Sequence, residues 1–226
     1  AHKSSADHDG RYYTKSQLLP IIHYLALDYW TSRNSGTSYD LRGVAYANGL
    51  WVVVGGSGTI LTSLDGISWT RRTSGTLRDL YDVAYANGLW VVVGGDGRIL
   101  TSTNGTSWTS RSSGTSSSLE GIAYGNGLWV AVGEIGTILT STDGTSWTSR
   151  TSGTWDLRSV AYADGVWVVV GGDGRILTSL DGTSFTTWVP RTSGTSCNLL
   201  DVAYANGLWV VVGTEGMILT AQFITP

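Results

Sequence analysis

The chain has 226 residues, of which 41% are apolar and 14% charged, and its net charge is −3. This length supports one sizeable core, and the absence of a basic field excludes the phosphate neutralisation on which nucleic-acid binding depends. The single Cys197 excludes an internal disulfide framework and a cysteine-rich metal site. No apolar run reaches the ~20 residues that span a bilayer, so we expect no membrane insertion.

Residues 1–27 precede the regular part of the chain and are interpreted as an attachment or oligomerisation segment. Residues 8–18 read H-D-G-R-Y-Y-T-K-S-Q-L. This stretch resembles the H-D-x-R-Y-Y-T-K-[ST]-[EQ]-[VL] segment of tail-fibre proteins of bacteriophages and related contractile particles, where it often leads into an oligomerising helix. The resemblance implies other tail or particle subunits as partners of residues 1–27. It also implies a virion tail or extracellular particle as the location, with a secreted protein as the alternative.

Pro20 interrupts the longer coiled coil that such segments usually enter, which leaves room for a short stalk. Leu18, Ile22 and Leu25, or Ile22, Leu25 and Tyr29, form an apolar seam at helical spacing. This seam fits a homotrimer contact and packing under the chain's own domain equally well. His2 and His8 could meet around a threefold axis and bind a metal, but a solvated tail is the favoured interpretation, so no metal is expected.

The rest of the chain is a fivefold internal repeat. The string V-A-Y-A-N-G-L-W begins at Val44 and recurs with small changes at intervals of about 39 residues. A partner string, W-T-x-R-x-S-G-T, ends each unit. Such a period predicts a stacked or radial array of one supersecondary unit. The first string begins at Val44, Val83, Ile122, Val160 and Val202, and the second at Trp30, Trp69, Trp108, Trp147 and, in altered form, Trp188.

Each unit is predicted to contain four short antiparallel strands, which we call A to D. In the second unit these are residues 80–86, 89–94, 98–102 and 107–112. Asn87-Gly88 and Asn104-Gly105 are predicted to form type I′ hairpin turns between A and B and between C and D. The strands are apolar throughout because each sheet is covered on both faces by its neighbours, which is typical of a propeller blade.

Strands A, B and C occur five times, and the fifth C strand, residues 217–220, has no D strand after it. Residues 29–34 carry a D-type sequence without strands A to C before it. We therefore predict an all-β fold over residues 28–226. It is a five-bladed β-propeller of four-stranded antiparallel blades, closed by the N-terminal strand in the last blade, after a short helical or extended segment. The alternative, an open solenoid, would leave a sheet edge unpaired.

The turn between strands C and D reads S-L-D-G-I-S-W from Ser63 and recurs in the next three units. It resembles the Asp-box of sialidase-like propellers, S-x-D-x-G-x-x-W, but is one residue shorter. The resemblance implies that the aspartate braces the turn and that the aromatic residue packs between blades. These roles would fall to Asp65, Asp143, Asp181, Trp69, Trp108 and Trp147.

Sialidase activity is the enzyme hypothesis suggested by this resemblance. However, the arginines recur once per unit at equivalent positions, whereas catalysis needs different groups that converge on one atom. We therefore predict that the protein is not an enzyme and has no cofactor. The recurring arginines are Arg33, Arg72, Arg111, Arg150 and Arg191.

The five copies differ most in the loops that join strands B to C and D to A. The short A-B and C-D turns are expected on one face of the propeller, which places the variable loops together on the other. Variable loops on a rigid scaffold commonly build recognition surfaces, and aromatic and arginine side chains dominate contact energies. The predicted ligand-binding residues are Tyr39, Asp40, Arg42, Arg78, Tyr81, Glu120, Trp155, Asp156, Arg158 and Asn198 around the D-A loops, with Asp96, Glu134, Asp173 and Glu215 in the B-C loops.

We predict a non-catalytic receptor-binding or adhesion module at the tip of a tail fibre or similar particle, which binds cell-surface carbohydrate through the B-C and D-A loops. Three alternatives stay open at this point. The loops could have drifted after duplication without a role. Five equivalent pockets could make a multivalent lectin. The domain could instead be a structural cap or spacer whose loops touch other subunits.

Overall fold

A computed structural model describes residues 30–150, 153–183 and 187–222. The chain divides into two compact units, Ala1–Asn34 and Ser35–Pro226. The predicted attachment segment, residues 1–27, lies outside the described residues, as does the helical seam within it. Among the described residues, no helix combines the length and the apolar character that crossing a bilayer requires.

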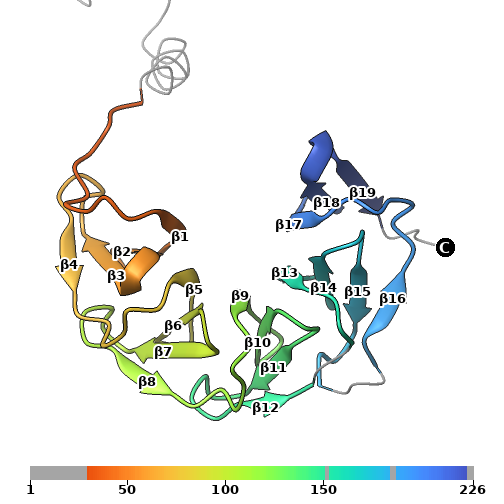
Figure 1. The fold of residues 1–226 in the computed structure, drawn as a ribbon, viewed down its shortest axis with the longest axis horizontal. Coiled ribbons are helices and arrows are strands. Elements are labelled where there is room, and N and C mark those ends of the chain that lie inside the picture. The colour runs from red at the N-terminus through yellow and green to blue at the C-terminus, as the bar shows by residue number, and fades with distance from the viewer. Residues whose placement is uncertain (1–29, 151–152, 184–186, 223–226) are drawn as a thin grey trace, which may run out of the picture. The chain divides into compact units, whose positions relative to one another are not determined.

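The unit Ser35–Pro226 consists of five antiparallel sheets, each built from strands that are consecutive in the chain (Figure 1). We call these sheets blades 1 to 5, and their inner three strands match the predicted A, B and C strands closely. Blade 1 comprises β1 (Leu41–Ala47), β2 (Leu50–Gly55), β3 (Thr59–Ser63) and β4 (Thr70–Arg72), and blade 2 comprises β5 (Leu80–Ala86), β6 (Leu89–Gly94), β7 (Arg98–Ser102) and β8 (Thr109–Arg111). Blade 3 comprises β9 (Leu119–Gly125), β10 (Leu128–Gly133), β11 (Ile138–Ser141) and β12 (Thr148–Ser149). Blade 4 comprises β13 (Leu157–Ala163), β14 (Val166–Gly171), β15 (Ile176–Ser179) and β16 (Val189–Arg191), and blade 5 comprises β17 (Leu199–Ala205), β18 (Leu208–Gly213) and β19 (Ile218–Gln222).

The A-B turns have the predicted type I′ backbone. Asn87 has φ 49° and Gly88 has φ 78°, and the corresponding pairs in the other blades are also left-handed at both positions. Such turns match the twist of the flanking strands. They explain why each A-B connection has only two residues between paired strands.

The prediction of a type I′ turn between strands C and D was wrong. Gly105 has a positive φ of 72°, but Asn104 does not. The side-chain oxygen of Asn104 instead accepts hydrogen bonds from the backbone amides of Thr106 and Ser107, each at 2.9 Å. Because the Asn104 side chain accepts hydrogen bonds from the backbone amides of the turn, the turn does not need a second residue with positive φ beside Gly105.

Neighbouring blades pack face to face through interdigitated apolar side chains. Between blades 1 and 2, Val52 and Ile60 meet Leu80, Val83 and Trp90, all of which are buried. Equivalent clusters lie between blades 2 and 3, blades 3 and 4, and blades 4 and 5. Burial of each such side chain contributes about 1.5–3 kcal/mol. The repeated apolar runs therefore serve as the two covered faces of each sheet.

The five blades follow one another around an arc in which the A strands of the first and last blades, β1 and β17, do not meet (Figure 1). The outer faces of the end blades are correspondingly exposed. Val44 is 61% exposed, whereas its blade 2 counterpart Val83 is 4% exposed, and Ile218 is 65% exposed, whereas its blade 1 counterpart Ile60 is fully buried. The structure therefore presents two unpaired apolar sheet faces.

The predicted closing strand is not among the strands of the structure. The described residues of segment 29–34, which are residues 30–34, carry no strand, and the sheet of blade 5 has three strands in the described part of the chain. The blade architecture is thus established, and closure by the N-terminal strand stays a prediction.

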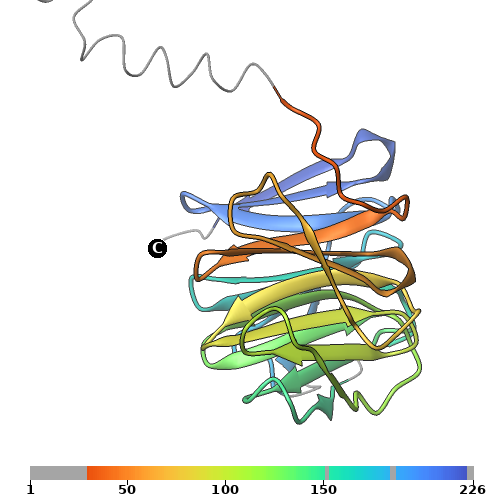
Figure 2. The same cartoon turned by 90° about the vertical axis from the view of Figure 1, so that its left-hand side faces the viewer.

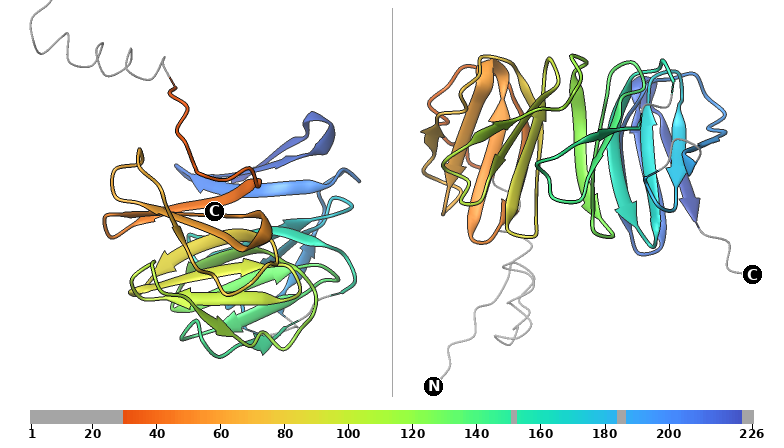
Figure 3. Two further views of the ribbon diagram at one scale, coloured as in Figure 1. Left: turned by 60° about the vertical axis from the view of Figure 1, so that its left-hand side comes forward. Right: turned by 90° about the horizontal axis from the view of Figure 1, so that it is seen from below.

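The turns and loops of the Ser35–Pro226 unit gather at the two opposite ends of its strands (Figures 2 and 3). At one end, the C-D turns of blades 2, 3 and 4 lie against the preceding blade: Gly105 is next to the side chain of Leu50, the residue that follows the A-B turn of blade 1. The A-B and C-D turns therefore share one face, as predicted. The loops that join B to C and D to A occupy the other.

Candidate functional site

The B-C and D-A loops of each blade are joined by a backbone hydrogen bond. In blade 2, Gly95 N donates to Asp79 O at 2.9 Å, and in blade 3, Glu134 N donates to Ser118 O at 3.0 Å. The same bond recurs in the other three blades. The predicted grouping of the variable loops on one face is therefore confirmed. We call this surface the loop face.

Four of the predicted residues follow one another across the loop face, with direct contacts at two inter-blade boundaries and an electrostatic interaction between Tyr81 and Glu120 at the third. They are Arg42, Tyr81, Glu120 and Arg158, which occupy the second position of strand A in blades 1 to 4. The guanidinium carbon of Arg42 lies 5.4 Å from the ring centre of Tyr81, which is cation–π distance. Arg158 approaches the carboxylate of Glu120 at 3.7 Å. These positions come together because each blade presents the start of strand A at the same height.

A bulge places these side chains on the loop face. In blade 1, Leu41 pairs with Gly55 and Gly43 with Val54, so that Arg42 has no partner across β2. The same register shift occurs at Tyr81, Glu120 and Arg158. Such bulges re-aim one side chain away from the regular alternation of the strand. The recurring bulge thus supplies one outward-facing residue per blade.

The electrostatic balance of this cluster is acidic. Arg42 pairs with Asp40 and Asp79, and Arg158 pairs with Glu120 and Asp156. A fifth carboxylate, Glu134, acts on Glu120 through its charge. Burial raises the pKa of the Glu120 carboxyl, and the negative charge of Glu134 raises it further against the opposing effect of Arg158. Burial, followed by the charges of Glu120 and Asp79, also raises the pKa of the Tyr81 hydroxyl. The site therefore carries excess negative charge.

Two predicted aromatic residues are available on the loop face. Tyr39 is 50% exposed and Trp155 is 39% exposed. The guanidinium carbon of Arg175 lies 3.6 Å from the centre of the Trp155 ring, which holds the indole in one orientation while leaving part of it accessible. Trp155 therefore has a cation on its ring and a partly exposed surface that a ligand could reach.

Other predicted residues brace the loops to one another. A carboxylate oxygen of Asp156 accepts a hydrogen bond from the backbone amide of Ile135 in the preceding blade at 3.2 Å. Likewise, Asn198 Oδ1 accepts a hydrogen bond from the backbone amide of Asp173 in the preceding blade at 3.2 Å. These contacts tie the D-A loop of one blade to the B-C loop of the blade before it. For these two residues, the structural role occupies one side-chain oxygen.

The remaining predicted residues make separate local contacts. Arg78 forms an ion pair with Asp96 at 2.8 Å, and both side chains are largely exposed. Glu134 accepts from Ser118 N at 3.2 Å, and Glu215 lies 3.7 Å from Cys197 Sγ. Apart from Glu134, whose charge acts on Glu120 and Tyr81, these side chains lie outside the chain of contacts that begins at Arg42.

Sequence reasoning missed two residues of the site. The Asp79 carboxylate accepts a hydrogen bond from Ser57 N at 2.9 Å and forms an ion pair with Arg42 at 3.4 Å. Asp79 occupies the same position of the repeat as the predicted residues Asp40, Asp156 and Asn198, and this equivalence could have identified it. Arg175 stands at the first position after a Gly-Asp-Gly loop, and its stacking partner could not be inferred from spacing.

The aspartates of the C-D turns brace these turns as expected. Asp65 accepts hydrogen bonds from the amides of Ile67 and Ser68, both at 2.8 Å, and these bonds lower the pKa of its carboxyl to about 2. Trp108 and Trp147 pack against the clusters between blades. These turns lie on the face opposite the loop face. Among the described residues, no group of His, Cys, Asp and Glu is arranged to hold a metal ion.

No protein-family model matches the sequence, and a search of curated proteins finds no match. Solved structures with a similar fold do exist. YCF48 from Cyanidioschyzon merolae superposes with a TM-score of 0.66 at 18% identity, over 84% of this chain and 69% of that one. Virginiamycin B lyase from Staphylococcus aureus gives a TM-score of 0.69 at 12% identity, over 86% of this chain and 74% of that one.

A computationally designed protein, Ika8, gives a TM-score of 0.66 at 16% identity and is covered over 58% of its length. YCF48 and the lyase are β-propeller proteins, so the likeness establishes the propeller-like blade architecture of this chain. At these identities it establishes the fold alone.

Proposed function

We propose that the protein is a non-catalytic receptor-binding or adhesion module that binds cell-surface carbohydrate through its loop face. The observation that carries the proposal is the juxtaposition of exposed aromatic rings with a polar cluster on one surface. Sugar rings stack on aromatic faces and exchange hydrogen bonds with carboxylate and guanidinium groups. Tyr39 and Trp155 would supply the stacking, and the cluster of Arg42, Tyr81, Glu120 and Arg158 would supply the polar contacts.

The acidic balance of the cluster favours a neutral or amino-bearing glycan over a polyanionic one. Five carboxylates accompany two arginines, and both arginines already have acidic partners. A sulfated or sialylated chain would bring like charge to these carboxylates, which disfavours its binding. Hydroxyl-rich and amino sugars meet acceptors instead.

The second part of the proposal concerns display on a particle. The resemblance of residues 8–18 to tail-fibre segments supports attachment of residues 1–27 to other tail or particle subunits, with a homotrimer as one arrangement. Location on a virion tail or extracellular particle follows from the same eleven residues. Several copies on one particle would raise a weak sugar affinity through multivalency.

The third part is closure of the ring. Residues 29–34 carry the D-type sequence, and β19 is an edge strand of a three-stranded sheet. Pairing the two would complete blade 5 and remove an exposed edge. It would also bring Tyr39 and Asp40 next to the loops of blade 5, which would make the loop face continuous.

A different function is supported by one comparison. A structure of YCF48 bound to D1 peptide resembles this chain with a TM-score of 0.63 at 20% identity, over 81% of this chain and 64% of that one. A propeller of this kind can therefore engage a peptide segment. On this alternative the protein is a structural cap or spacer module, and its loop face contacts the chain of another subunit rather than a glycan.

The test is binding of the full chain to an array of neutral, amino-bearing, sulfated and sialylated glycans. We expect binding to neutral or amino-bearing glycans, and binding weaker by about fivefold or more for Trp155→Ala and for Tyr39→Ala, since stacking on one aromatic side chain is worth about 1–3 kcal/mol for nucleic-acid bases. Trp108→Phe, on a residue between blades, is the control and should leave affinity unchanged.

Absence of glycan binding would contradict the proposal. If glycans are not bound and the same two variants fail to enter assembled particles, the structural-module alternative is supported. If binding survives both variants and all five blades contribute equally, the interpretation as a lectin with five equivalent sites replaces the loop-face proposal. Release of product from a polysaccharide would contradict the non-catalytic assignment.

A further inference from the structure

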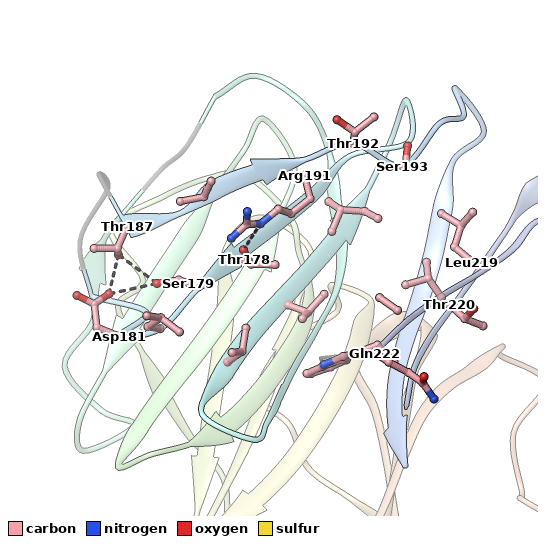
Figure 4. A pocket seen from close by; sticks show the side chains of 18 residues that line it. Thr178, Ser179, Asp181, Thr187, Arg191, Thr192, Ser193, Leu219, Thr220 and Gln222 are labelled. Atoms are coloured by element: carbon pink, nitrogen blue, oxygen red, sulfur yellow. Dashed lines mark hydrogen bonds between the residues drawn. The ribbon is translucent and has the colours of Figure 1, made fainter. Parts of the chain in front are cut away.

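An apolar groove of about 920 Å³ lies between blades 4 and 5. Its walls are β14 to β16 on one side and β18 and β19 on the other, with Arg191 and Thr178 facing Leu219, Thr220 and Gln222 in Figure 4. Its apolar lining includes Val168, Ile176, Trp209, Val211 and Leu219.

The other three inter-blade spaces are built from equivalent walls, and each holds a tryptophan. Trp108, at the start of strand D in blade 2, packs against the cluster between blades 1 and 2. Trp147 and Trp188 occupy the same place between blades 2 and 3 and between blades 3 and 4. In the space between blades 4 and 5 the described residues place no such tryptophan. The groove includes the place that a fourth tryptophan would occupy.

Each of these tryptophans begins a W-x-x-R pattern, and two further tryptophans repeat it, Trp69 with Arg72 and Trp30 with Arg33. Trp69 directly precedes β4 of blade 1, so Trp30 is the one that has no blade assigned to it. Trp30 is 92% exposed, which is unfavourable for a large apolar side chain that could be buried. We infer that the groove between blades 4 and 5 is the receptor site for residues 30–34 of the same chain, with Trp30 as its apolar anchor. This inference rests on the ring-closure part of the proposed function and names the contacts that make it.

A polar contact in every complete blade supports this register. The D-strand arginine donates from Nε to a threonine of strand C in the same blade, as in Arg72 to Thr62 at 2.8 Å and Arg191 to Thr178 at 2.8 Å. Blades 2 and 3 have the same bond. The corresponding threonine of blade 5 is Thr220, which lines the groove, and the corresponding arginine is Arg33.

The loop that follows residues 30–34 has matching contact sites on blade 5. In blade 4, Gly174 N donates to the carbonyl of Cys197 in the next blade at 2.9 Å, and a Cβ on Gly174 would lie 2.0 Å from Thr195 O. The equivalent Gly216 of blade 5 has nothing within 4 Å of such a Cβ. Thr37 and Tyr39 occupy the positions of Thr195 and Cys197 in the repeat, so their carbonyls fit the open space.

The same chain is a better occupant than a second copy. Docking residues 30–34 carries β1 onto the exposed face of blade 5, so that Val44 and Ile218 become covered together. In one chain this closes the ring and leaves no free edge. If residues 30–34 docked instead into a second copy, the two exposed faces would remain at the ends of a head-to-tail assembly, which could add further copies without limit. Tethering also gives the segment a high effective concentration.

The test uses the full chain with two introduced cysteines in a Cys197→Ser background. In blade 1, Thr62 pairs with Thr70, and the equivalent pair in blade 5 is Thr220 with Thr31. Directly paired residues lie within disulfide range. Thr31→Cys with Thr220→Cys should form a disulfide within one chain under mild oxidation, whereas Thr31→Cys with Leu219→Cys, on opposite faces of the strand pair, should not. A disulfide between chains, or none, would overturn the inference.

A melting experiment tests the anchor itself. Trp30→Ala should lower the Tm as much as the matched variant Trp147→Ala, on the order of 10 °C, and Trp30→Phe should lower it less. An unchanged Tm for Trp30→Ala beside a lowered Tm for Trp147→Ala would contradict burial of Trp30. Glycan binding is measured on the same variants, below the melting temperatures of the variant and the wild type. This separates docking of residues 30–34 from glycan binding by the loop face, because glycan binding through Trp155 would persist even if residues 30–34 do not dock in the groove.

Discussion

Asp82 provides a quantitative test of the packing between blades 2 and 3. Its carboxylate accepts hydrogen bonds from the backbone amides of Val83 at 2.8 Å and Ile122 at 2.9 Å. Burial raises the pKa of Asp82 from 3.8 to about 6, because it outweighs these hydrogen bonds, and the charge of Asp201 raises it further. The folded state therefore holds a proton that the unfolded state has released between these two pH values.

The consequence is a loss of stability as the pH rises. Below pH 3.8 the carboxyl is protonated in both states, and above about pH 6 it is ionised in both, so the free energy of unfolding falls between these limits. The two pKa values differ by about 2, which corresponds to about 3 kcal/mol. Asp82→Asn removes this dependence but leaves one backbone amide facing the NH₂ group, which costs about 1 kcal/mol.

We therefore expect the two stability curves to cross. Asp82→Asn should be less stable than the wild type by about 1 kcal/mol near pH 4 and more stable by about 2 kcal/mol at pH 7. Urea denaturation from pH 4 to pH 7.5 measures both. Asp96→Asn, on an exposed carboxylate of the same blade that pairs with Arg78, is the control and should keep the wild-type slope. Parallel curves for Asp82→Asn and the wild type would refute the reasoning.

Asp143→Ala removes an acceptor for two backbone amides of its turn and should lower the free energy of unfolding by about 1 kcal/mol, seen as a shift of the urea midpoint; an unchanged midpoint would contradict the bracing role. Gly174→Ala places a Cβ against a backbone oxygen at a φ of 66° and should lower the urea midpoint strongly. If the ring closes, Gly216→Ala should lower the urea midpoint by a similar amount. A much smaller decrease for Gly216→Ala would indicate an open arc. Arg175→Met removes a buried Nε that has no hydrogen-bond partner together with the cation on Trp155. It should leave the Tm unchanged while weakening glycan binding a few-fold, since the stacking is worth about 0.5–1 kcal/mol; equal binding would show that Arg175 does not orient the indole.

The repeat made the blade architecture predictable. Strand lengths, the type I′ A-B turns and the grouping of the variable loops on one face followed from the period, the Asn-Gly pairs and the apolar runs, because these depend on local backbone preference and on burial of both sheet faces. The C-D turns were mispredicted from the same dipeptide. There the side chain of Asn104 replaces a backbone requirement, and a dipeptide rule does not register side-chain acceptors.

The composition of the site required the tertiary structure. Loop variability identified Arg42, Tyr81, Glu120 and Arg158 as candidates, but only the stacking of blades places residues that are 38 or 39 positions apart side by side. The repeated bulge that turns them outward leaves no trace in sequence spacing, since it depends on how strand A pairs with strand B. Arg175 lies over Trp155 for the same reason: blade packing, rather than sequence order, determines which side chains meet.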